Sequence, residues 1–356
     1  MSIIRSRLPF DDNFIPPEIV DRTEEQTVLK THFEPIISGD VQPINLHVIG
    51  SIGSGKTVTT RVILQNLPAK PCYIQVDEWI RAKTYKMVCD LLSFFGLKIY
   101  GNVCDSLYNI KAVAGDRPFI VVIDEADNMS TEDLDPILHF LSRETYATTV
   151  IISRRPNILD GLREDTRDSF KYREIVFKSY RKAELFEILK QRAEMGLKPG
   201  SYTDEVLYRI AEEAEPYGSA RYALDLLLEM AELSGSRPLK EDYIPVAIGY
   251  VEKRSLVRAL QSLPTYHALL LTAVYDLCRN HPKDITLAKV YERFNTVCTE
   301  RGLRPLSKRR LYDLLSDLKI RGYIDITRHG KGRGRGTECY VEMQDYTKEA
   351  IDSLQK

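Results

Sequence analysis

Five short apolar runs alternate with longer amphipathic segments in the first half of the sequence, and this alternation restricts the fold more than any other feature. The runs are INLHVIG (44–50), CYIQVD (72–77), PFIVVIDE (118–125), TTVIIS (148–153) and EIVF (174–177). Strands that are apolar on both faces are typical of parallel sheets covered by helices on each side. The sequence therefore predicts an α/β domain with a parallel sheet over residues 1–178.

Two further domains are expected after this sheet. Beyond residue 177 the strand pattern stops, and only helical periodicity continues to about residue 250, which predicts an all-helical domain over residues 179–255. Three more helix-like segments bounded by Pro or Gly follow, and then two alternating runs, YIDITRHG and TECYVEM, flank the segment KGRGRG. Three helices and a hairpin predict a winged helix-turn-helix domain over residues 256–356.

The charge of the chain is nearly balanced overall but unevenly distributed. Lys and Arg number 50 against 51 Asp and Glu, for a formal net charge of −1. Residues 301–335, however, carry eleven Lys or Arg against three Asp or Glu, a local charge of +8 that leaves −9 on the remainder. A basic module of this kind is typical of a nucleic-acid-binding domain.

Neither a metal framework nor a membrane segment is expected from the sequence. The six cysteines are scattered without a C-x-x-C pair, which indicates reduced, buried thiols rather than zinc ligands or disulfides. No apolar run approaches the ~20 residues that a membrane helix needs, and the first residues lack a signal-peptide core. We therefore expect no membrane partner and a cytoplasmic, nucleoid-associated location.

The first chemical motif is a phosphate-binding loop after the first apolar run. Its sequence fits G-x-x-x-x-G-K-[ST] between a predicted strand and a predicted helix, the context that this motif requires. The Lys56 side chain would reach the β- and γ-phosphate oxygens, and the Thr57 hydroxyl would be a ligand of Mg²⁺. The residues expected to bind ATP or ADP here are Gly50, Ser51, Ile52, Gly53, Ser54, Gly55, Lys56, Thr57 and Val58.

The second motif is FIVVIDEAD, residues 119–127. Its buried strand would deliver Asp124 to the carboxyl edge of the sheet as a second Mg²⁺ ligand, with Glu125 beside it to orient or polarise the attacking water. The acids after this strand could also simply cap the next helix, a role open to Asp127 or Ser130. Together with the phosphate loop, the catalytic interpretation is favoured.

These motifs, with GSARYALDLL at residues 218–227, resemble the archaeal replication initiators related to the origin recognition complex and the cell-division-control helicase loaders. The resemblance implies an AAA+ ATPase base, a helical lid and a C-terminal winged helix. It extends to FIPPEIVDRTEEQ (14–26), which is similar to the adenine-contacting segment of that family and adds Ile15 and Arg22 to the expected nucleotide contacts. The implied partners are double-stranded origin DNA, sister initiator proteins and the replicative helicase.

The lid would contribute Arg221 to the nucleotide site. Ser219 is a plausible helix cap, which puts Arg221 in the first turn of a helix, where it could reach the γ-phosphate or form an ordinary surface salt bridge. The resemblance favours the γ-phosphate role.

The sequence departs from the family at Arg154, which follows the run TTVIIS where the family commonly has Asn to position the water. Arginine cannot accept a hydrogen bond from water, so slow hydrolysis is expected. The segment 162–170 aligns with the arginine-finger region of the family, and Arg163 or Arg167 could serve the nucleotide of a neighbouring subunit or act only as charged surface residues. The DNA-contacting element that the family has ahead of its acidic strand corresponds to residues 97–114, which contain few basic residues.

The C-terminal domain is expected to bind the double helix through its last helix and its hairpin. In the helix over residues 307–320, the leucines at 311, 314, 315 and 318 fall on one face and predict the core side. The amino end of this helix would enter the major groove, and the hairpin would reach phosphates or the minor groove. The candidate DNA-binding residues are Ser307, Lys308, Arg309, Arg310 and Tyr312 of the helix, and Lys331, Gly332, Arg333, Gly334 and Arg335 of the hairpin.

Two functions are consistent with these motifs. The first is an ATP-binding initiator that recognises origin DNA and helps to recruit the helicase, which Glu125 and Arg221 favour. The second is a winged-helix DNA-binding regulator, an accessory paralogue or a transcriptional switch, that holds ATP as a structural ligand with little turnover. Arg154 favours the second.

Overall fold

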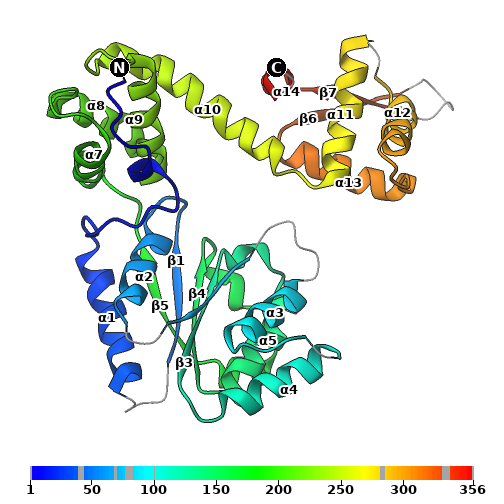
Figure 1. The fold of residues 1–356 in the computed structure, drawn as a ribbon. Helices are drawn as coiled ribbons and strands as arrows, with labels where there is room; N and C mark the ends of the chain where they lie inside the picture. Colours follow the sequence, from blue (N-terminus) through cyan, green and yellow to red (C-terminus); the bar gives the residue numbers. More distant parts are fainter. Residues whose placement is uncertain are drawn as a thin grey trace. The chain divides into compact units, whose positions relative to one another are not determined.

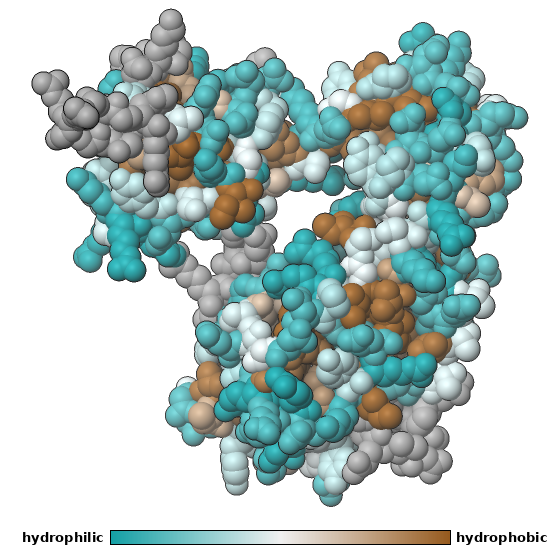
Figure 2. Space-filling view, turned by 180° about the vertical axis from the view of Figure 1, so that it is seen from behind, coloured by the Kyte–Doolittle hydropathy of each residue, from teal (hydrophilic) through white to brown (hydrophobic). Residues whose placement is uncertain are grey.

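The computed structural model describes residues 2–38, 44–67, 70–76, 83–99, 101–280, 285–330 and 337–354. Contacts within the chain define two compact units, Met1–Ala247 and Ile248–Lys356. Figure 2 shows that hydrophilic residues cover most of the visible face, with hydrophobic residues in small separate patches.

The first unit is built on a five-stranded parallel sheet (Figure 1). Its strands are β1 (Asn45–Gly50), β2 (Cys72–Gln75), β3 (Phe119–Asp124), β4 (Ala147–Ser153) and β5 (Tyr172–Phe177). They lie in the order β2-β3-β4-β1-β5. Each coincides with one of the five apolar runs, so the predicted α/β fold with a parallel sheet is confirmed.

Helices cover both faces of the sheet (Figure 1). One face carries α1 (Thr23–Ser38) and α2 (Lys56–Gln65), and the other carries α3 (Lys83–Phe94), α4 (Val103–Ala114) and α5 (Thr131–Glu144). The short helices η2 (Ala126–Asn128), η3 (Pro156–Leu159) and α6 (Glu164–Ser169) lie in the connections around β4 and β5.

The two layers of helices explain why the inner strands β1, β3 and β4 are buried along almost their whole length. Along β3, Phe119, Val121 and Ile123 join the core with α3, α4 and α5, whereas Ile120 and Val122 join the core with α1 and α2. Because successive side chains of a strand point to opposite faces, both sets must be apolar. Parallel strands also end at a common edge, which brings the loop after β1 close to the acids after β3.

A three-helix lid completes the first unit. It consists of α7 (Lys182–Gly196), α8 (Asp204–Ala214) and α9 (Ala220–Ser234). The short helix η4 (Glu215–Tyr217) connects α8 to α9, and η5 (Glu241–Tyr243) follows α9. The N-terminal segment packs on these helices through η1 (Leu8–Phe10), and the Ile3 N–H donates to the Gly235 carbonyl at 2.8 Å. The lid therefore belongs to the same compact unit as the sheet, and only the C-terminal region forms a second unit. The three-domain boundaries at residues 178 and 255 remain a prediction.

The second unit has the winged-helix arrangement. It begins within α10 (Ile244–Gln261) and continues through α11 (Thr265–Asn280), α12 (Leu287–Glu300) and α13 (Lys308–Ile320). The strands β6 (Ile324–Gly330) and β7 (Thr337–Met343) pair in antiparallel register from Ile324 opposite Met343 to Gly330 opposite Thr337, which confirms the predicted hairpin. A final helix, α14 (Asp345–Leu354), was not expected from the sequence. Across the described residues, no helix combines the length and the apolar character needed to cross a bilayer.

Candidate nucleotide-binding and DNA-binding sites

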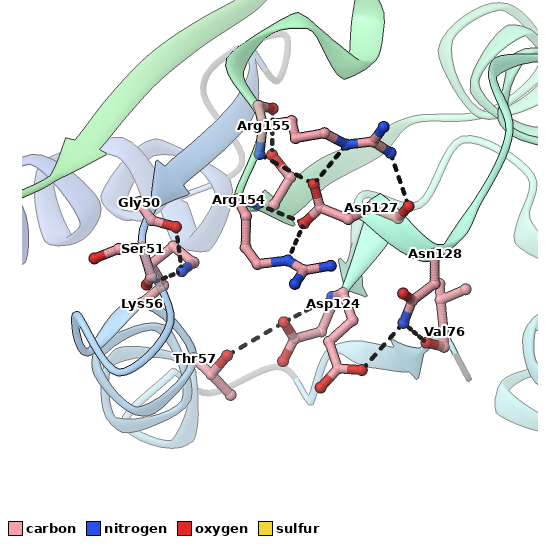
Figure 3. A network of polar contacts seen from close by, with 12 residues as sticks. Gly50, Ser51, Lys56, Thr57, Val76, Asp124, Asp127, Asn128, Arg154 and Arg155 are labelled. Atoms are coloured by element: carbon pink, nitrogen blue, oxygen red, sulfur yellow. Dashed lines mark hydrogen bonds and ion pairs between the residues drawn. The ribbon is translucent and has the colours of Figure 1, made fainter. Parts of the chain in front are cut away.

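The phosphate loop turns sharply between β1 and α2. Gly53 and Gly55 have φ angles of 74° and 91°, which glycine adopts far more easily than other residues, and Gly55 is the N-cap of α2. Lys56 is 8 % exposed, and its Nζ donates to the carbonyl oxygens of Gly50 and Ser51, both at 2.7 Å (Figure 3). Burial lowers the pKa of Lys56 to about 8, against the charge of Asp124, which raises it. The loop thus places a cation beside the N-terminus of a helix, an arrangement that binds phosphate.

Asp124 is oriented by donors from three parts of the chain. It ends β3 and is 2 % exposed. Its Oδ1 accepts hydrogen bonds from the Thr57 hydroxyl at 3.2 Å and from the Glu125 N–H at 2.9 Å, and its Oδ2 accepts one from the Tyr73 hydroxyl (Figure 3 shows the Thr57 contact). A hydroxyl and a carboxylate are hard oxygen donors, so Thr57 and Asp124 together suit Mg²⁺.

Glu125 occupies an unusual backbone conformation beside Asp124. Its φ of 57° is uncommon for a residue other than glycine, and such strain is often found at functional sites. Its carboxylate accepts from Gln75 Nε2 at 3.4 Å and from Asn128 Nδ2 at 3.3 Å. Burial, followed by the charge of Asp124, raises the pKa of Glu125. The carboxylate is thus held by two amides at the edge of the cavity.

The Asp127 carboxylate holds the chain at the end of β4. It accepts hydrogen bonds from the backbone N–H groups of Arg154 at 2.5 Å and Arg155 at 3.0 Å (Figure 3). The side-chain Nε atoms of Arg154 and Arg155 lie 3.5 Å and 3.2 Å from the same carboxylate. Burial acts to raise the pKa of Asp127, but these N–H donors outweigh burial and lower it. Capping of α5 falls to Ser130, whose Oγ accepts the Asp133 N–H. Of the two capping candidates, Asp127 is therefore excluded, because both its oxygens bind the arginine segment.

The lid contacts the phosphate loop directly. Ser219 caps α9 as expected, and the Ala220 N–H donates to the Gly53 carbonyl at 3.1 Å. Arg221, in the same turn, forms an ion pair with Asp12 at 2.8 Å. Both partners of this pair line the same cavity as the phosphate loop. The structure therefore shows the salt bridge of Arg221, and because Arg221 also lines the cavity, its contact with the γ-phosphate stays a prediction.

A cavity of about 390 Å³ lies among the loop, the acids, the lid and the N-terminal segment. This volume is within the ~300–1,000 Å³ of small-molecule sites. The expected site residues that line it are Ile15, Ile52, Gly53, Ser54, Gly55, Lys56, Thr57, Val58, Asp124, Glu125, Arg154 and Arg221. Gly50 and Ser51 instead provide the carbonyls that bind Lys56.

Arg22 is the exception among the expected nucleotide contacts. Its side chain is 4 % exposed and does not line the cavity. It donates to the Lys178 carbonyl at 2.6 Å, and its guanidinium lies 3.9 Å from the centre of the Tyr180 ring. Tyr180 does line the cavity, so Arg22 lies against a cavity-lining residue, and its contact with the nucleotide stays a prediction.

The two arginine-finger candidates are anchored within their own chain. Arg163 Nε donates to Asp135 Oδ2 at 2.5 Å, although its side chain stays 61 % exposed. Arg167 Nη2 donates to the carbonyls of Asp160 and Leu162 at 2.9 and 3.0 Å. Neither lines the cavity, and action on a neighbouring subunit remains a prediction.

In the second unit, the amino end of α13 carries the exposed basic cluster. Ser307 caps the helix, and the four predicted leucines are buried on its inner face. Lys308 Nζ lies 5.4 Å from the Tyr291 ring, and Arg310 forms an ion pair with Asp313 at 3.5 Å. Arg309 is exposed and has no ion pair with any described residue. Tyr312 is 52 % exposed, whereas Lys331, Gly332, Arg333, Gly334 and Arg335 lie outside the described residues.

Several supporting residues were missed by the sequence analysis. Tyr73 and Gln75 lie at the end of β2, so the rule that parallel strands end at one edge offers a signal for both. Asn128 lies three residues after Glu125, within reach of the acidic motif. Arg192, within α7, also lines the cavity, but the sequence gives no local signal for it.

Three protein-family models match the chain in succession. They are an AAA domain over residues 43–162, a Cdc6 AAA+ ATPase-type lid domain over 186–248, and a CDC6 C-terminal winged helix domain over 258–352. Together they follow the order of base, lid and winged helix.

Full-length relatives give the same assignment. An ORC1-type DNA replication protein of Methanothermobacter thermautotrophicus is 31 % identical over 335 residues, covering 92 % of this chain and 90 % of the relative. An ORC1-type DNA replication protein of Thermococcus onnurineus is 29 % identical, and the match covers 97 % of this chain and 89 % of the relative. Two solved structures have the same fold. Aeropyrum pernix ORC1 in complex with DNA matches with a TM-score of 0.77 and 22 % identity, covering 99 % of this chain and 98 % of that one. Cdc6p of Pyrobaculum aerophilum matches with a TM-score of 0.64 and 22 % identity, with the same coverage of the two chains. The chain therefore belongs to the ORC1/Cdc6-type family of archaeal replication initiators, AAA+ proteins with a C-terminal winged helix.

Proposed function

We propose that this protein is an ATP-binding replication initiator that recognises double-stranded origin DNA and helps to recruit the replicative helicase. One observation carries the ATP assignment: the phosphate loop, both acids of the second motif and Arg221 of the lid line a single cavity. Solved relatives support both ligands, since A. pernix ORC1 is in complex with DNA and A. pernix ORC2 is in ADPNP–ADP complexes.

In the nucleotide site, Lys56 and the N–H groups of the loop bind the phosphates. Thr57 and Asp124 would hold Mg²⁺, which when bound neutralises charge that develops on the phosphate oxygens. The Glu125 carboxylate accepts a hydrogen bond from the attacking water, and its raised pKa makes it a stronger proton acceptor than an ordinary glutamate. Arg221 exchanges its Asp12 partner for the γ-phosphate, so that the nucleotide is sensed by the helix that contacts Gly53.

The winged helix supplies the DNA contacts. Arg309 and its neighbours Ser307, Lys308, Arg310 and Tyr312 face the major groove from the first turns of α13, and the basic residues of the hairpin turn, Lys331, Arg333 and Arg335, bind phosphates. Sister initiators and the replicative helicase are partners that the family membership suggests, with Arg163 or Arg167 as the contact to a neighbour's nucleotide.

A second candidate function is a DNA-binding regulator that holds ATP without appreciable turnover. Arg154 favours it, because this side chain lines the cavity at the end of β4 and offers only hydrogen-bond donors. Its Nε lies 3.5 Å from the Asp127 carboxylate, so it is held in place at the site.

Single-turnover hydrolysis of ATP, with and without origin duplex, separates the two functions. The wild type should hydrolyse ATP faster than Glu125→Gln, while both bind ATP equally in an equilibrium titration. Lys56→Ala should lose nucleotide binding, and tight binding by this variant would contradict the phosphate assignment. Equal rates near background for wild type and Glu125→Gln would leave the regulator as the function.

The origin-binding half of the proposal is tested by footprinting on candidate origin DNA, alone and with sister initiators. Protection of the origin should exceed that of unrelated duplex. Protection at promoters in place of origins would identify a transcriptional switch.

A further inference from the structure

Arg192 is a buried cation whose hydrogen-bonding groups are only partly used. It lies in α7 of the lid and is 7 % exposed. Its Nε and Nη1 atoms have no hydrogen-bond partner among the described residues. Burial lowers the pKa of Arg192 to about 10, against the nearby Tyr180, so the side chain is still charged at neutral pH. Buried N–H groups without acceptors are unfavourable and rare, which indicates that something outside the protein supplies the acceptor.

The side chain lines the same cavity as Lys56 but contacts a different part of the chain. Its guanidinium carbon lies 4.6 Å from the centre of the Phe14 ring, and the neighbouring Gln191 donates to the Glu18 carbonyl at 3.0 Å. The lining of this cavity includes an apolar set, Phe14, Ile15, Pro16, Ile19, Val20 and Ile188, and Phe14 of this set contacts Arg192. Lys56, by contrast, contacts loop carbonyls next to the acids. An apolar wall with one unsatisfied polar group suits a flat heteroaromatic ring better than a phosphate.

The chemistry of the guanidinium restricts what it can contact. Arginine has five N–H donors in one plane and no acceptor, so it pairs with acceptor atoms only. An adenine ring offers unprotonated nitrogens at N1, N3 and N7, whereas its exocyclic amine is a donor. Because Phe14 lies over one face of the guanidinium, that contact helps to fix the plane in which the N–H groups point.

We propose that Arg192 recognises the base of the bound nucleotide by donating hydrogen bonds to a ring nitrogen of adenine. This inference rests on the proposed ATP binding and names a group that determines specificity at that site. When the lid closes over the nucleotide, Arg192 of α7 would contact the base while Arg221 of α9 contacts the phosphates.

Equilibrium titrations of the full-length protein with ATP and its 1-deaza, 3-deaza and 7-deaza analogues test this proposal, since each analogue replaces one ring nitrogen by C–H. The wild type should bind one analogue about tenfold more weakly than ATP, the effect of a hydrogen bond to a charged group. Arg192→Gln should bind ATP about tenfold more weakly and should no longer distinguish that analogue from ATP, because the two changes remove the same contact. Arg192→Lys, which keeps the charge without the planar fork, should lose the same discrimination.

Competition by tripolyphosphate separates the base from the phosphates. Arg192→Gln should bind tripolyphosphate as the wild type does, whereas Lys56→Ala should not bind it. Arg209→Gln is the matched control, since Arg209 is a lid arginine that pairs with Glu212 and does not line the cavity. This control should keep the wild-type discrimination among the analogues. The thermal midpoint of Arg192→Gln without nucleotide should equal or exceed that of the wild type, because the substitution removes unsatisfied buried N–H groups.

The possible failures are distinguishable. A wild type that binds neither ATP nor tripolyphosphate would overturn the proposed function and this inference together. Normal ATP binding with equal affinity for all three analogues would overturn the Arg192 assignment alone, and this series requires no variant. Parallel losses of ATP and tripolyphosphate binding in Arg192→Gln would assign the side chain to the phosphates, which also contradicts the proposal.

Discussion

His47 is a fully buried histidine in β1, which lies between β4 and β5 in the sheet. Its Nε2 lies 2.8 Å from the Ser153 hydroxyl, which donates in turn to the Arg155 carbonyl at 2.9 Å. Burial lowers the pKa of His47 to about 4, against the charges of Asp127 and Asp160, which raise it. The neutral ring therefore links β1 to the end of β4, where the arginine segment begins.

This low pKa predicts a loss of stability in acid. An unfolded histidine titrates near 6.5, so between that pH and about 4 the unfolded chain binds a proton that folded His47 does not. The stabilisation is complete above pH 6.5 and is lost as the pH falls toward 4, by about 3 kcal/mol in all. Urea unfolding of wild type and His47→Gln at pH 7 and pH 4 should show the smaller loss in the variant, because Gln does not titrate. Parallel pH dependences for the two proteins would contradict the assignment.

At the level of single residues, the sequence locates the groups of the proposed chemistry better than the groups that orient them. Asp124 and Thr57 follow from their motifs, since a parallel sheet brings the ends of β1 and β3 to one edge. Tyr73, which donates to the other oxygen of Asp124, is not part of either motif, and its role depends on β2 lying beside β3. Arg22 matches the family pattern, but its hydrogen bond to the Lys178 carbonyl and its contact with the Tyr180 ring join segments far apart in the chain, which no local pattern predicts.

Among the elements, the contact between α9 and the phosphate loop depends on the absence of a side chain at Gly53. A Cβ atom there would lie 2.0 Å from the Ser219 hydroxyl oxygen, and the φ of 74° already disfavours other residues. The Gly53 carbonyl also accepts the Ala220 N–H. The lid and the loop therefore fit together only with glycine at this position.

Comparing Gly53→Ala with Gly96→Ala separates the clash of a new methyl group with Ser219 from the backbone strain that both variants share. Gly96 has a similar φ of 68°, but a Cβ there would meet nothing within 4 Å. Gly96→Ala should lower the free energy of unfolding by about 1–2 kcal/mol, the cost of a left-handed alanine. Gly53→Ala should lower it by at least about 1 kcal/mol more through the clash with Ser219. Urea denaturation of both variants measures this difference, and equal losses would show that the lid yields to the added methyl group.

The exposed basic residues at the amino end of α13 predict a contact with DNA whose affinity depends on salt. Arg309→Ala should weaken binding to duplex DNA and reduce the slope of log K against log salt by about one, because one cation that displaces counterions from the major groove is lost. Lys319→Ala on the same helix is the control, since Lys319 forms an ion pair with Asp325 at 2.7 Å in the last turn. Fluorescence anisotropy across a salt series gives both slopes. An unchanged slope for Arg309→Ala would place the DNA elsewhere.

The sequence predicted the strands and helices in which most side chains are buried, and it missed a helix in which few are buried. The inner strands β1, β3 and β4 are buried along almost their whole length because each of their faces meets a layer of helices, so their runs are unmistakable. The helix α14 buries only Thr347 and Ala350 among its described side chains, so no large apolar residue marks its core side. The hairpin was predicted because its two runs alternate, and the register from Ile324 to Gly330 agrees with that alternation.

At the scale of the whole molecule, packing joins the expected base and lid into one compact unit, Met1–Ala247, while the boundaries at residues 178 and 255 stay predictions. The sequence separates base from lid where the strand pattern stops, but packing does not, since η1 packs on α7 and α9 and the Ala220 N–H binds the loop. Those long-range contacts are invisible to a local pattern. The second unit begins at Ile248, within α10, and has its own buried core of leucines from α13 with strand residues such as Val341 and Met343.

Two separate cores predict two separate unfolding transitions, each sensitive to its own ligand. ATP with Mg²⁺ at a hundredfold excess over its Kd should stabilise the unit of residues 1–247 by about 2.7 kcal/mol, which corresponds to a rise of about 5–10 °C for a domain of that size. Duplex DNA should raise the other transition, and Lys56→Ala should abolish the response to ATP while keeping the response to DNA. Scanning calorimetry of the full chain resolves these outcomes. A single transition that both ligands raise together would mean that α10 couples the two cores into one cooperative unit, and the nucleotide site would then act on the DNA-binding unit through folding stability itself.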